Sequence, residues 1–262
     1  MDEHLDNGLS ADSIRENLQT RFIGQRVLYL PLVTSTMDIA RQEVMNGAAE
    51  GTVILAEEQT AGRGRLKRLW LTPRGSIAMS VILYPALKYL PYIIMIASLA
   101  VARSIEGITG IEAGIKWPND ILINGKKVCG ILIENEVQKG RVNFVIVGIG
   151  INVNLGLADY PEIESIATSL SDALGREVSR VDIIRRLLAE MEQLYSDVTA
   201  GQSIFEEWRD KLIMLGKRVM VTIGDARYEG TALSVEPDGR LLLRLFDGSL
   251  AEVVAGDVTL RE

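Results

Sequence analysis

Between residues 26 and 154, short apolar runs alternate with longer amphipathic stretches. Apolar runs bounded by Gly, Pro or polar residues predict strands, and apolar residues at helical spacing behind a Ser or Thr cap predict helices. The predicted strands are 26–33, 52–58, 76–84 and 141–154, and the predicted helices are 34–47 and 90–108. The run 76–84 is apolar on both faces, so we expect it in the middle of a sheet.

Two of these predictions include particular side chains. Ser35 or Thr36 caps the helix 34–47, and the side expected to be buried is formed by Ile39, Val44 and Met45. In the helix 90–108, Pro91 is expected in the first turn, where a missing N–H costs no hydrogen bond. The length of this helix and its charges argue against a membrane span.

The segment 115–134, IKWPNDILINGKKVCGILIE, predicts a β-hairpin. Asn124-Gly125 between two apolar runs is the strongest short hairpin signal. The hairpin should bring Asp120 close to Lys127. A solvated surface ion pair is an equally good interpretation of that pair by itself.

The C-terminal part of the chain changes its pattern at Gly216. Before it, 180–199 is the clearest amphipathic helix, capped by Ser179, and 203–213 predicts another. After it, short strands about ten residues apart are separated by tight turns, which indicates a small barrel or sandwich. We therefore expect an N-terminal tail and short helix (1–24), a main domain (25–215) and a small all-β domain (216–262).

Charge and composition exclude several classes of protein. The net charge is −7 and the pI about 5.0, which argues against sequence-independent binding of nucleic acid. The polar N-terminus does not resemble a signal peptide, and no apolar run reaches the roughly 20 residues that a membrane span needs. With a single cysteine, Cys129, no intramolecular disulfide can form, so we expect a cytoplasmic protein.

The residue types also limit the chemistry. The only histidine is His4, in a tail expected to be poorly ordered. Catalysis by a Ser-His-Asp or Cys-His site is therefore not expected, and a zinc site of Cys and His ligands cannot form. Cys129 is flanked by apolar residues and is expected to be buried rather than nucleophilic. Any metal would be a hard ion such as magnesium, for which we assign no protein ligands.

A cationic, glycine-rich stretch stands out in this acidic chain. The sequence EEQTAGRGRLKRLW (57–70) places Gly62 and Gly64 among four cations, Arg63, Arg65, Lys67 and Arg68. Glycine allows sharp turns, and arginine binds carboxylates and phosphates through two parallel hydrogen bonds. The stretch predicts a flexible loop that folds over a small anion, although a solvated surface turn is the alternative.

A second glycine pair lies within the stretch 141–154, where the predicted strand ends. Gly148-Ile149-Gly150 resembles part of a dinucleotide fingerprint, but the third glycine and the following helix pattern are missing. We expect these glycines to mark a close approach of the backbone to a ligand, with the amide of Asn152 beside it.

Together, EEQTAGRGRLKRLW, KWPNDI, KKVCGIL and GIGIN, in this order and with STMD at 35–38, resemble the biotin protein ligases. The resemblance extends from about Arg21 to the end. It implies an α+β fold: a mixed β-sheet with flanking helices, as in class II synthetases, plus a small C-terminal all-β barrel domain. The N-terminal winged-helix domain of some members is not seen, so a monofunctional type is expected.

The family's reaction has two steps. The biotin carboxylate attacks the α-phosphate of ATP to form biotinyl-5′-AMP, and a lysine of a biotin carboxyl carrier protein then takes the biotin. Two anions meet in the first step, so cations and magnesium must offset their repulsion. A carboxylate is already ionised at neutral pH, so no histidine base is needed.

The resemblance also implies roles for individual residues. The residues expected to bind biotin are Ser35, Thr36, Gln59, Gly62, Arg63, Gly64, Arg65, Lys127 and Gly130. Those expected to bind ATP or the adenylate are Arg63, Arg65, Arg68, Trp70, Asn119 and Asn152. Those expected to act directly on the reacting groups are Arg63, Asp120 and Lys127. Met37 stands where the family often has asparagine, which puts one polar contact in doubt.

Three other interpretations remain open. A lipoate ligase would share the chemistry, but the polar Ser35, Thr36 and Gln59 favour a ureido ring. A nucleic-acid-binding module could use GRGRLKR as an Arg-rich patch, which the acidic pI opposes. A homologue that only binds biotin is disfavoured because Arg63, Arg65, Asp120 and Lys127 are all retained. The sequence also allows a homodimer, with VNFVIVGI as an edge strand that pairs across a two-fold axis.

Overall fold

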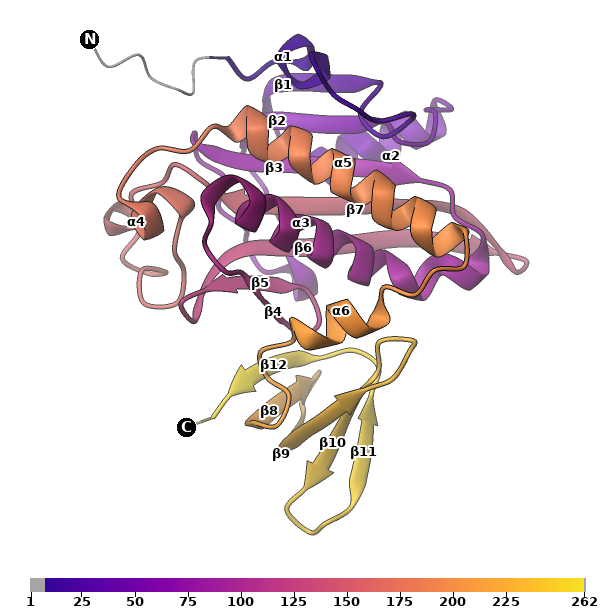
Figure 1. Cartoon of the computed structure of the whole chain (residues 1–262), viewed down its shortest axis with the longest axis vertical. Coiled ribbons are helices and arrows are strands. Elements are labelled where there is room, and N and C mark those ends of the chain that lie inside the picture. The colour runs from indigo at the N-terminus through magenta and orange to yellow at the C-terminus, as the bar shows by residue number, and fades with distance from the viewer. Residues whose placement is uncertain (1–7, 262) are drawn as a thin grey trace.

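A seven-stranded mixed sheet forms the centre of the larger part of the molecule (Figure 1). The computed structural model describes residues 8–261, so His4 lies outside the described residues. In spatial order the strands are β1 (Val27–Val33), β2 (Val53–Gln59), β3 (Ser76–Leu83), β7 (Arg141–Asn152), β6 (Lys126–Gln138), β5 (Asp120–Ile123) and β4 (Gly114–Lys116). Only β1 and β2 pair in parallel, so the predicted mixed sheet is confirmed.

Helices cover both faces of this sheet. The remaining elements of this part are α1 (Ala11–Arg15), α2 (Thr36–Met45), α3 (Ile93–Thr109), α4 (Leu170–Leu174), α5 (Arg180–Thr199) and α6 (Phe205–Asp210), with short 3₁₀ turns at Arg65–Lys67, Leu87–Tyr92 and Leu157–Asp159. Helices α3 and α5 pack on one face, with the larger apolar core between them and the sheet. Helix α2 packs on the other face over a smaller core that includes Ile54, Ile82 and Ile146.

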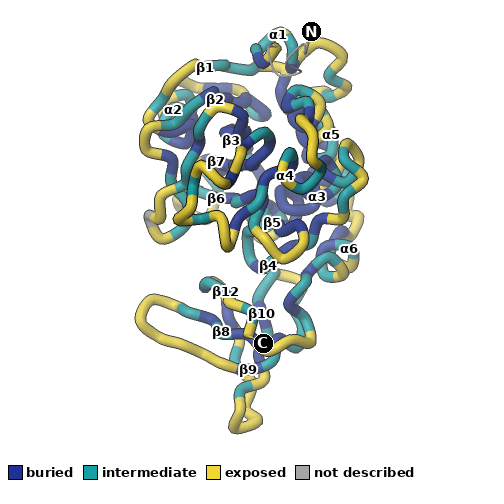
Figure 2. The backbone as a smooth tube through the Cα atoms, turned by 90° about the vertical axis from the view of Figure 1, so that its left-hand side faces the viewer, coloured by how far each residue is buried: buried dark blue, intermediate teal, exposed yellow. Residues whose placement is uncertain are grey.

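Helix α3 is the most deeply buried helix, as Figure 2 shows by its dark colour. Among the described residues, the stretch Leu87–Thr109 is long and apolar enough to cross a membrane by length and composition alone, but 61% of its apolar 18-residue window is buried inside the protein. Apolar residues all around a helix are also typical of a core helix. Helix α5 is amphipathic as predicted, and the Ser179 side chain caps it by accepting a hydrogen bond from the backbone N–H of Asp182.

Several local predictions are wrong in detail. In α2 the buried residues are Thr36, Met37 and Ala40, whereas Met45 is 74% exposed. Nine residues of α-helix turn through about two and a half revolutions, so Met45 lies on the side opposite Thr36. Pro91 lies in the 3₁₀ turn before α3 rather than in its first turn, and α6 ends at Asp210.

The proposed edge strand is also wrong. Residues 145–151 of β7 pair with β3 on one side and with β6 on the other. Most of VNFVIVGI (142–149) therefore lies inside the sheet, where its backbone N–H and C=O groups are already used and are not available to a second copy of the chain.

The C-terminal part forms a separate antiparallel sheet, which confirms the predicted small all-β domain. Its five strands are arranged in the order β11 (Leu250–Val253), β10 (Leu241–Leu245), β9 (Ala226–Val235), β8 (Arg218–Ile223) and β12 (Asp257–Leu260). The turn between β9 and β10 contacts the main part of the molecule, where the indole N–H of Trp117 donates to the Gly239 carbonyl at 2.8 Å. Trp117 is 2% exposed, so this contact is shielded from water.

Candidate active site

A cavity of about 420 Å³ lies beside the central strands and beneath residues 60–71, which we call the lid. Every residue predicted to belong to the site lines the cavity, with the exception of Gly62. Gly62 lies in the lid next to it, where a Cβ atom would be only 2.4 Å from the Trp70 carbonyl oxygen.

Polar groups converge at the end of the cavity formed by β2 and the start of α2. The backbone N–H of Thr36 donates to Gln59 Oε1 at 2.8 Å, and the Thr36 hydroxyl lies 3.2 Å from the same oxygen. Ser80 Oγ donates to the Thr36 hydroxyl at 2.8 Å, and Gln59 Nε2 donates to Thr72 Oγ1 at 2.9 Å. Since Ser35 and Thr36 are buried, this network holds Gln59 in one orientation against the start of α2.

Glycines on two neighbouring strands make room for the Trp70 indole. Gly130 of β6 and Gly150 of β7 are direct partners across the sheet. A Cβ atom at Gly150 would lie 2.2 Å from Trp70 Nε1, and one at Gly130 would lie 3.1 Å from Trp70 Cζ3. Gly148 similarly makes room for the Met37 sulfur, 2.6 Å from an added Cβ. The glycines expected to approach a ligand thus accommodate two side chains, Trp70 and Met37.

The position of the Trp70 ring leaves one hydrogen-bonding group unused. Among residues 8–261, no acceptor forms a hydrogen bond with the buried indole Nε1. A buried polar group without a partner costs about 1–3 kcal/mol. The Lys127 ammonium lies 5.2 Å from the centre of the indole ring, within cation–π range.

A carboxylate flanked by two lysines lies at the other end of the cavity. Asp120 Oδ1 is 2.6 Å from Lys127 Nζ, and Asp120 Oδ2 is 3.3 Å from Lys116 Nζ. The predicted proximity of Asp120 and Lys127 is confirmed. The Asn124-Gly125 hairpin produces it, with both residues at positive φ as a tight two-residue turn requires. Sequence reasoning missed Lys116, although it belongs to the quoted KWPND motif.

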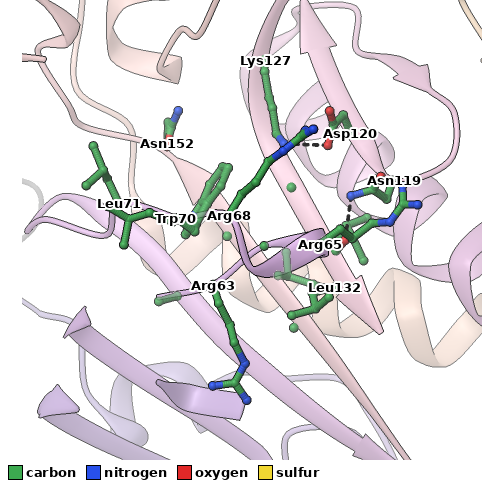
Figure 3. Close-up of a pocket in the computed structure, with 18 of the residues that line it drawn as sticks. Arg63, Arg65, Arg68, Trp70, Leu71, Asn119, Asp120, Lys127, Leu132 and Asn152 are labelled. Atoms are coloured by element: carbon green, nitrogen blue, oxygen red, sulfur yellow. Dashed lines mark hydrogen bonds and ion pairs between the residues drawn. The ribbon is translucent and has the colours of Figure 1, made fainter. Parts of the chain in front are cut away.

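The three lid arginines are oriented in two directions, as Figure 3 shows. Arg63 points away from Asp120 and pairs with Asp38 at 2.6 Å and Glu134 at 3.4 Å. The hydrogen bond to Asp38 raises the pKa of the Arg63 guanidinium above its ordinary value. In this conformation Arg63 therefore attaches the lid to α2 and β6.

Arg65 and Arg68 point toward the small C-terminal domain. Arg65 Nη1 donates to Asn119 Oδ1 at 2.8 Å and to the Gly256 carbonyl at 3.1 Å. Arg68 Nη2 lies 2.5 Å from Asp257 Oδ2, an ion pair without the geometry of a hydrogen bond. Burial lowers the pKa of Arg65 from its ordinary value, and Asp257 acts in the opposite direction. Asp257 lines the cavity and has no signal in the sequence.

The two asparagines have structural partners as well. Asn119 Nδ2 donates to the Ile131 carbonyl, and Asn152 Nδ2 donates to the Thr168 carbonyl at 3.0 Å. Within the described part of the chain, no three His, Cys, Asp or Glu side chains are grouped as a metal site. Asp120 and Asp257 are each paired with cations.

Comparisons with known proteins identify the family. Residues 29–152 match the Biotin/lipoate A/B protein ligase family, and residues 214–261 match the Biotin protein ligase C terminal domain. A biotin--[acetyl-CoA-carboxylase] ligase of Mycobacterium tuberculosis is 32% identical over 261 residues, with 95% of each chain covered. The chain belongs to the biotin protein ligase family.

Other similar proteins support the same family assignment. The bifunctional ligase/repressor BirA of Bacillus spizizenii is 40% identical over 258 residues, which cover 96% of this chain and 79% of that protein. The structure of a biotin protein ligase from Aquifex aeolicus in complex with biotin and ATP superimposes with a TM-score of 0.78 at 29% identity, and covers 90% of this chain and 99% of that one. The C-terminal domain match and these relatives favour biotin over the lipoate alternative.

Proposed function

We propose that this cavity activates biotin with ATP and transfers it to a lysine of a biotin carboxyl carrier protein. One observation carries the proposal: a single cavity has a fixed polar network at one end and five cationic side chains along the rest. The network includes Thr36 and Gln59, and Ser35 lines the same end of the cavity. The cations are Arg63, Arg65, Arg68, Lys116 and Lys127. Such an arrangement suits a small neutral head group joined through an apolar part to a carboxylate and a polyphosphate.

The polar network would bind the ureido head of biotin. A ureido group has one carbonyl acceptor and two N–H donors. Gln59 and the hydroxyls of Ser35 and Thr36 provide both kinds of partner. Met37 is buried and apolar beside them, so it would contact the ring rather than replace a hydrogen bond.

The cations would bring the two anions together. When the carboxylate oxygen attacks the α-phosphorus, the bond to the β-phosphate oxygen breaks and pyrophosphate leaves. Lys127 would hold the biotin carboxylate and then the acyl-phosphate linkage, while Asp120 keeps Lys127 in place. Arg65 and Arg68 would exchange Asp257 for phosphate oxygens, and Arg63 would leave Asp38 and Glu134. Magnesium would enter with the nucleotide, on its phosphates.

In the second step, the acceptor amine attacks the acyl carbon, a C–N bond forms, and AMP leaves with the electron pair of the broken C–O bond. The lid would shield the mixed anhydride from water until the carrier arrives. Trp70 would close over the adenine, with Asn119 and Asn152 near the nucleotide. The carrier, a cytoplasmic location, the absence of nucleic-acid binding and a homodimer remain predictions.

The test is mass spectrometry of a biotin carrier domain after incubation with this protein, biotin and MgATP. We expect one biotin on one lysine, and biotin-dependent exchange of pyrophosphate into ATP. The variant Lys127→Met should lose most of both activities. Its neighbour Lys126, whose exposed side chain donates to the Glu164 carbonyl at 3.0 Å, is the matched control as Lys126→Met. The absence of both modification and exchange in the wild type would reject the proposal.

A further inference from the structure

The lid has two stems, residues 57–59 before it and residues 72–76 after it. The stems are joined near the lid by Gln59, whose backbone N–H and side chain donate to Thr72 at 3.4 and 2.9 Å. Farther out, Glu58 pairs with Arg74 at 2.7 Å. The Arg74 side chain of that pair is 77% exposed, and an exposed ion pair contributes little stability.

The third connection between the stems is buried and is made by Arg180, the first residue of α5. Arg180 Nη1 donates to Glu57 Oε1 at 2.9 Å in the first stem and to the Ser76 carbonyl at 3.0 Å in the second. Arg180 is 3% exposed and Glu57 is 8% exposed. The hydroxyl of Tyr29 in β1 donates to the other carboxylate oxygen of Glu57 at 3.0 Å. One guanidinium therefore links α5 to β2 and β3, whose ends lie beside it (Figure 1).

The segment before α5 makes a further connection to the second stem, in addition to the one through Arg180. The backbone of Asn154 donates to the Gly75 carbonyl at 2.8 Å. The Asn154 side chain exchanges two hydrogen bonds of 2.9 Å with the backbone of Val178. The start of α5 is thus connected to both stems, directly through Arg180 and indirectly through Asn154.

From these contacts we propose that Arg180 is a positioning residue for the lid. Arg180 holds both stems in place, so that residues 60–71 can move while Gln59 and the stems do not. The inference rests on the proposed function, because Gln59 is two residues from Glu57 and belongs to the biotin-binding network. With the stems fixed, Gln59 stays on the Thr36 amide while residues 60–71 rearrange. Without that connection, the stems separate, and both the biotin contact and lid closure loosen.

Replacing Arg180 alone would leave the Glu57 carboxylate buried without its cation, which strongly destabilises a fold. The better variant is the double replacement Glu57→Leu with Arg180→Met, since an apolar pair of similar volume often preserves stability. It removes the link to the Ser76 carbonyl without leaving a buried charge. Arg180→Lys is the conservative variant, because a lysine keeps the charge but cannot donate in a fork to both stems.

The control is Arg103→Met. Arg103 on α3 also pairs with two carboxylates, Glu190 and Glu207, but on the surface of the helical layer away from the lid. Circular dichroism and thermal unfolding would show that each variant is folded at the assay temperature. The assays are biotin-dependent ATP–pyrophosphate exchange, which gives KM and kcat, and the rate at which free biotinyl-adenylate appears in solution without a carrier.

For the double variant we expect the KM for biotin and the rate of adenylate escape each to rise about tenfold, the effect of one net hydrogen bond, with little change in kcat. Arg180→Lys should show a smaller rise in both, and Arg103→Met no rise. A folded double variant with wild-type KM and wild-type adenylate retention would overturn the inference, as would the same changes in Arg103→Met. If the double variant does not fold, wild-type behaviour of Arg180→Lys would overturn it. If the wild type itself makes no adenylate, the proposed function fails instead.

Discussion

The glycine at position 150 provides a direct test of the Trp70 site. In Gly150→Ala, the new methyl group would lie 2.2 Å from the indole Nε1 and 2.5 Å from Cε2. Non-bonded heavy atoms prefer about 3.5–4.0 Å, so the ring must move by about 1 Å or more. Overpacking of this kind costs about 1–3 kcal/mol. Gly130→Ala should have a weaker effect, because its nearest ring atom is 3.1 Å away.

If the closed site needs the indole over these strands, Gly150→Ala should weaken binding of a non-hydrolysable biotinyl-adenylate analogue by about 5- to 150-fold, the equivalent of that cost. Calorimetric titration measures this loss. Trp117 and Trp208 are fully buried, so a red shift in fluorescence would report on Trp70. Gly156→Ala is the control, since its nearest contact is 3.6 Å away and its φ is −78°. Unchanged affinity and unchanged emission in Gly150→Ala would refute the reasoning.

Three further predictions follow from single groups. Thr36→Val removes the hydroxyl that lies 3.2 Å from Gln59 Oε1. In the exchange assay the KM for biotin should therefore rise about tenfold with kcat unchanged. An unchanged KM would contradict the role of Thr36 in binding the ureido head. Burial raises the pKa of the Cys129 thiol above its ordinary value, so iodoacetamide at pH 8 should alkylate the unfolded protein quickly and the native protein hardly at all. Because the folded pKa is the higher one, this group's stabilising contribution is complete below the unfolded value of about 8.5 and falls as the pH rises above it. Burial acts to raise the pKa of Glu192, but hydrogen bonds from the backbone N–H groups of residues 21–23, at 2.6–2.8 Å, outweigh burial and lower it. Glu192→Gln should therefore lower the free energy of unfolding, measured in urea at pH 7, by about 1.5–3 kcal/mol. The difference from wild type should shrink as the pH falls below about 4.3, where the carboxylate becomes protonated. A difference that does not change with pH would show that the charge of Glu192 is not what stabilises the fold.

Most of the polar residues that line the cavity could be predicted because they lie in short, dense motifs. The loop 57–70 places glycines among cations in an acidic chain, a combination that suits binding of a small anion. The Asn124-Gly125 turn brings its two strands side by side, so the proximity of Asp120 and Lys127 could be predicted without a structure. The turn does not specify the exact register, in which a bulge places Asp120 opposite Gly130 and Lys127 opposite Leu122.

Features that depend on distant parts of the chain could not be predicted in this way. Asp257 meets Arg68 although 189 positions separate them, and Arg65 reaches the Gly256 carbonyl across 191 positions. No local pattern distinguishes Asp257 from the other acidic turn residues of the small domain. The same limit applies to Arg180, which in the sequence is only the first residue of an amphipathic helix.

The sequence by itself determined the mixed-sheet fold class, the small C-terminal all-β part, and most of the polar residues that line the cavity. These follow from residue types and from periodicities that act over a few neighbouring positions. Only the tertiary structure decided which of these residues are buried, which are exposed and which contact one another. It placed β7 inside the sheet, turned Met45 outward, paired Arg63 with Asp38, and seated Trp70 on Gly130 and Gly150. Each of these outcomes depends on which distant segments pack together, and local sequence patterns do not specify that packing.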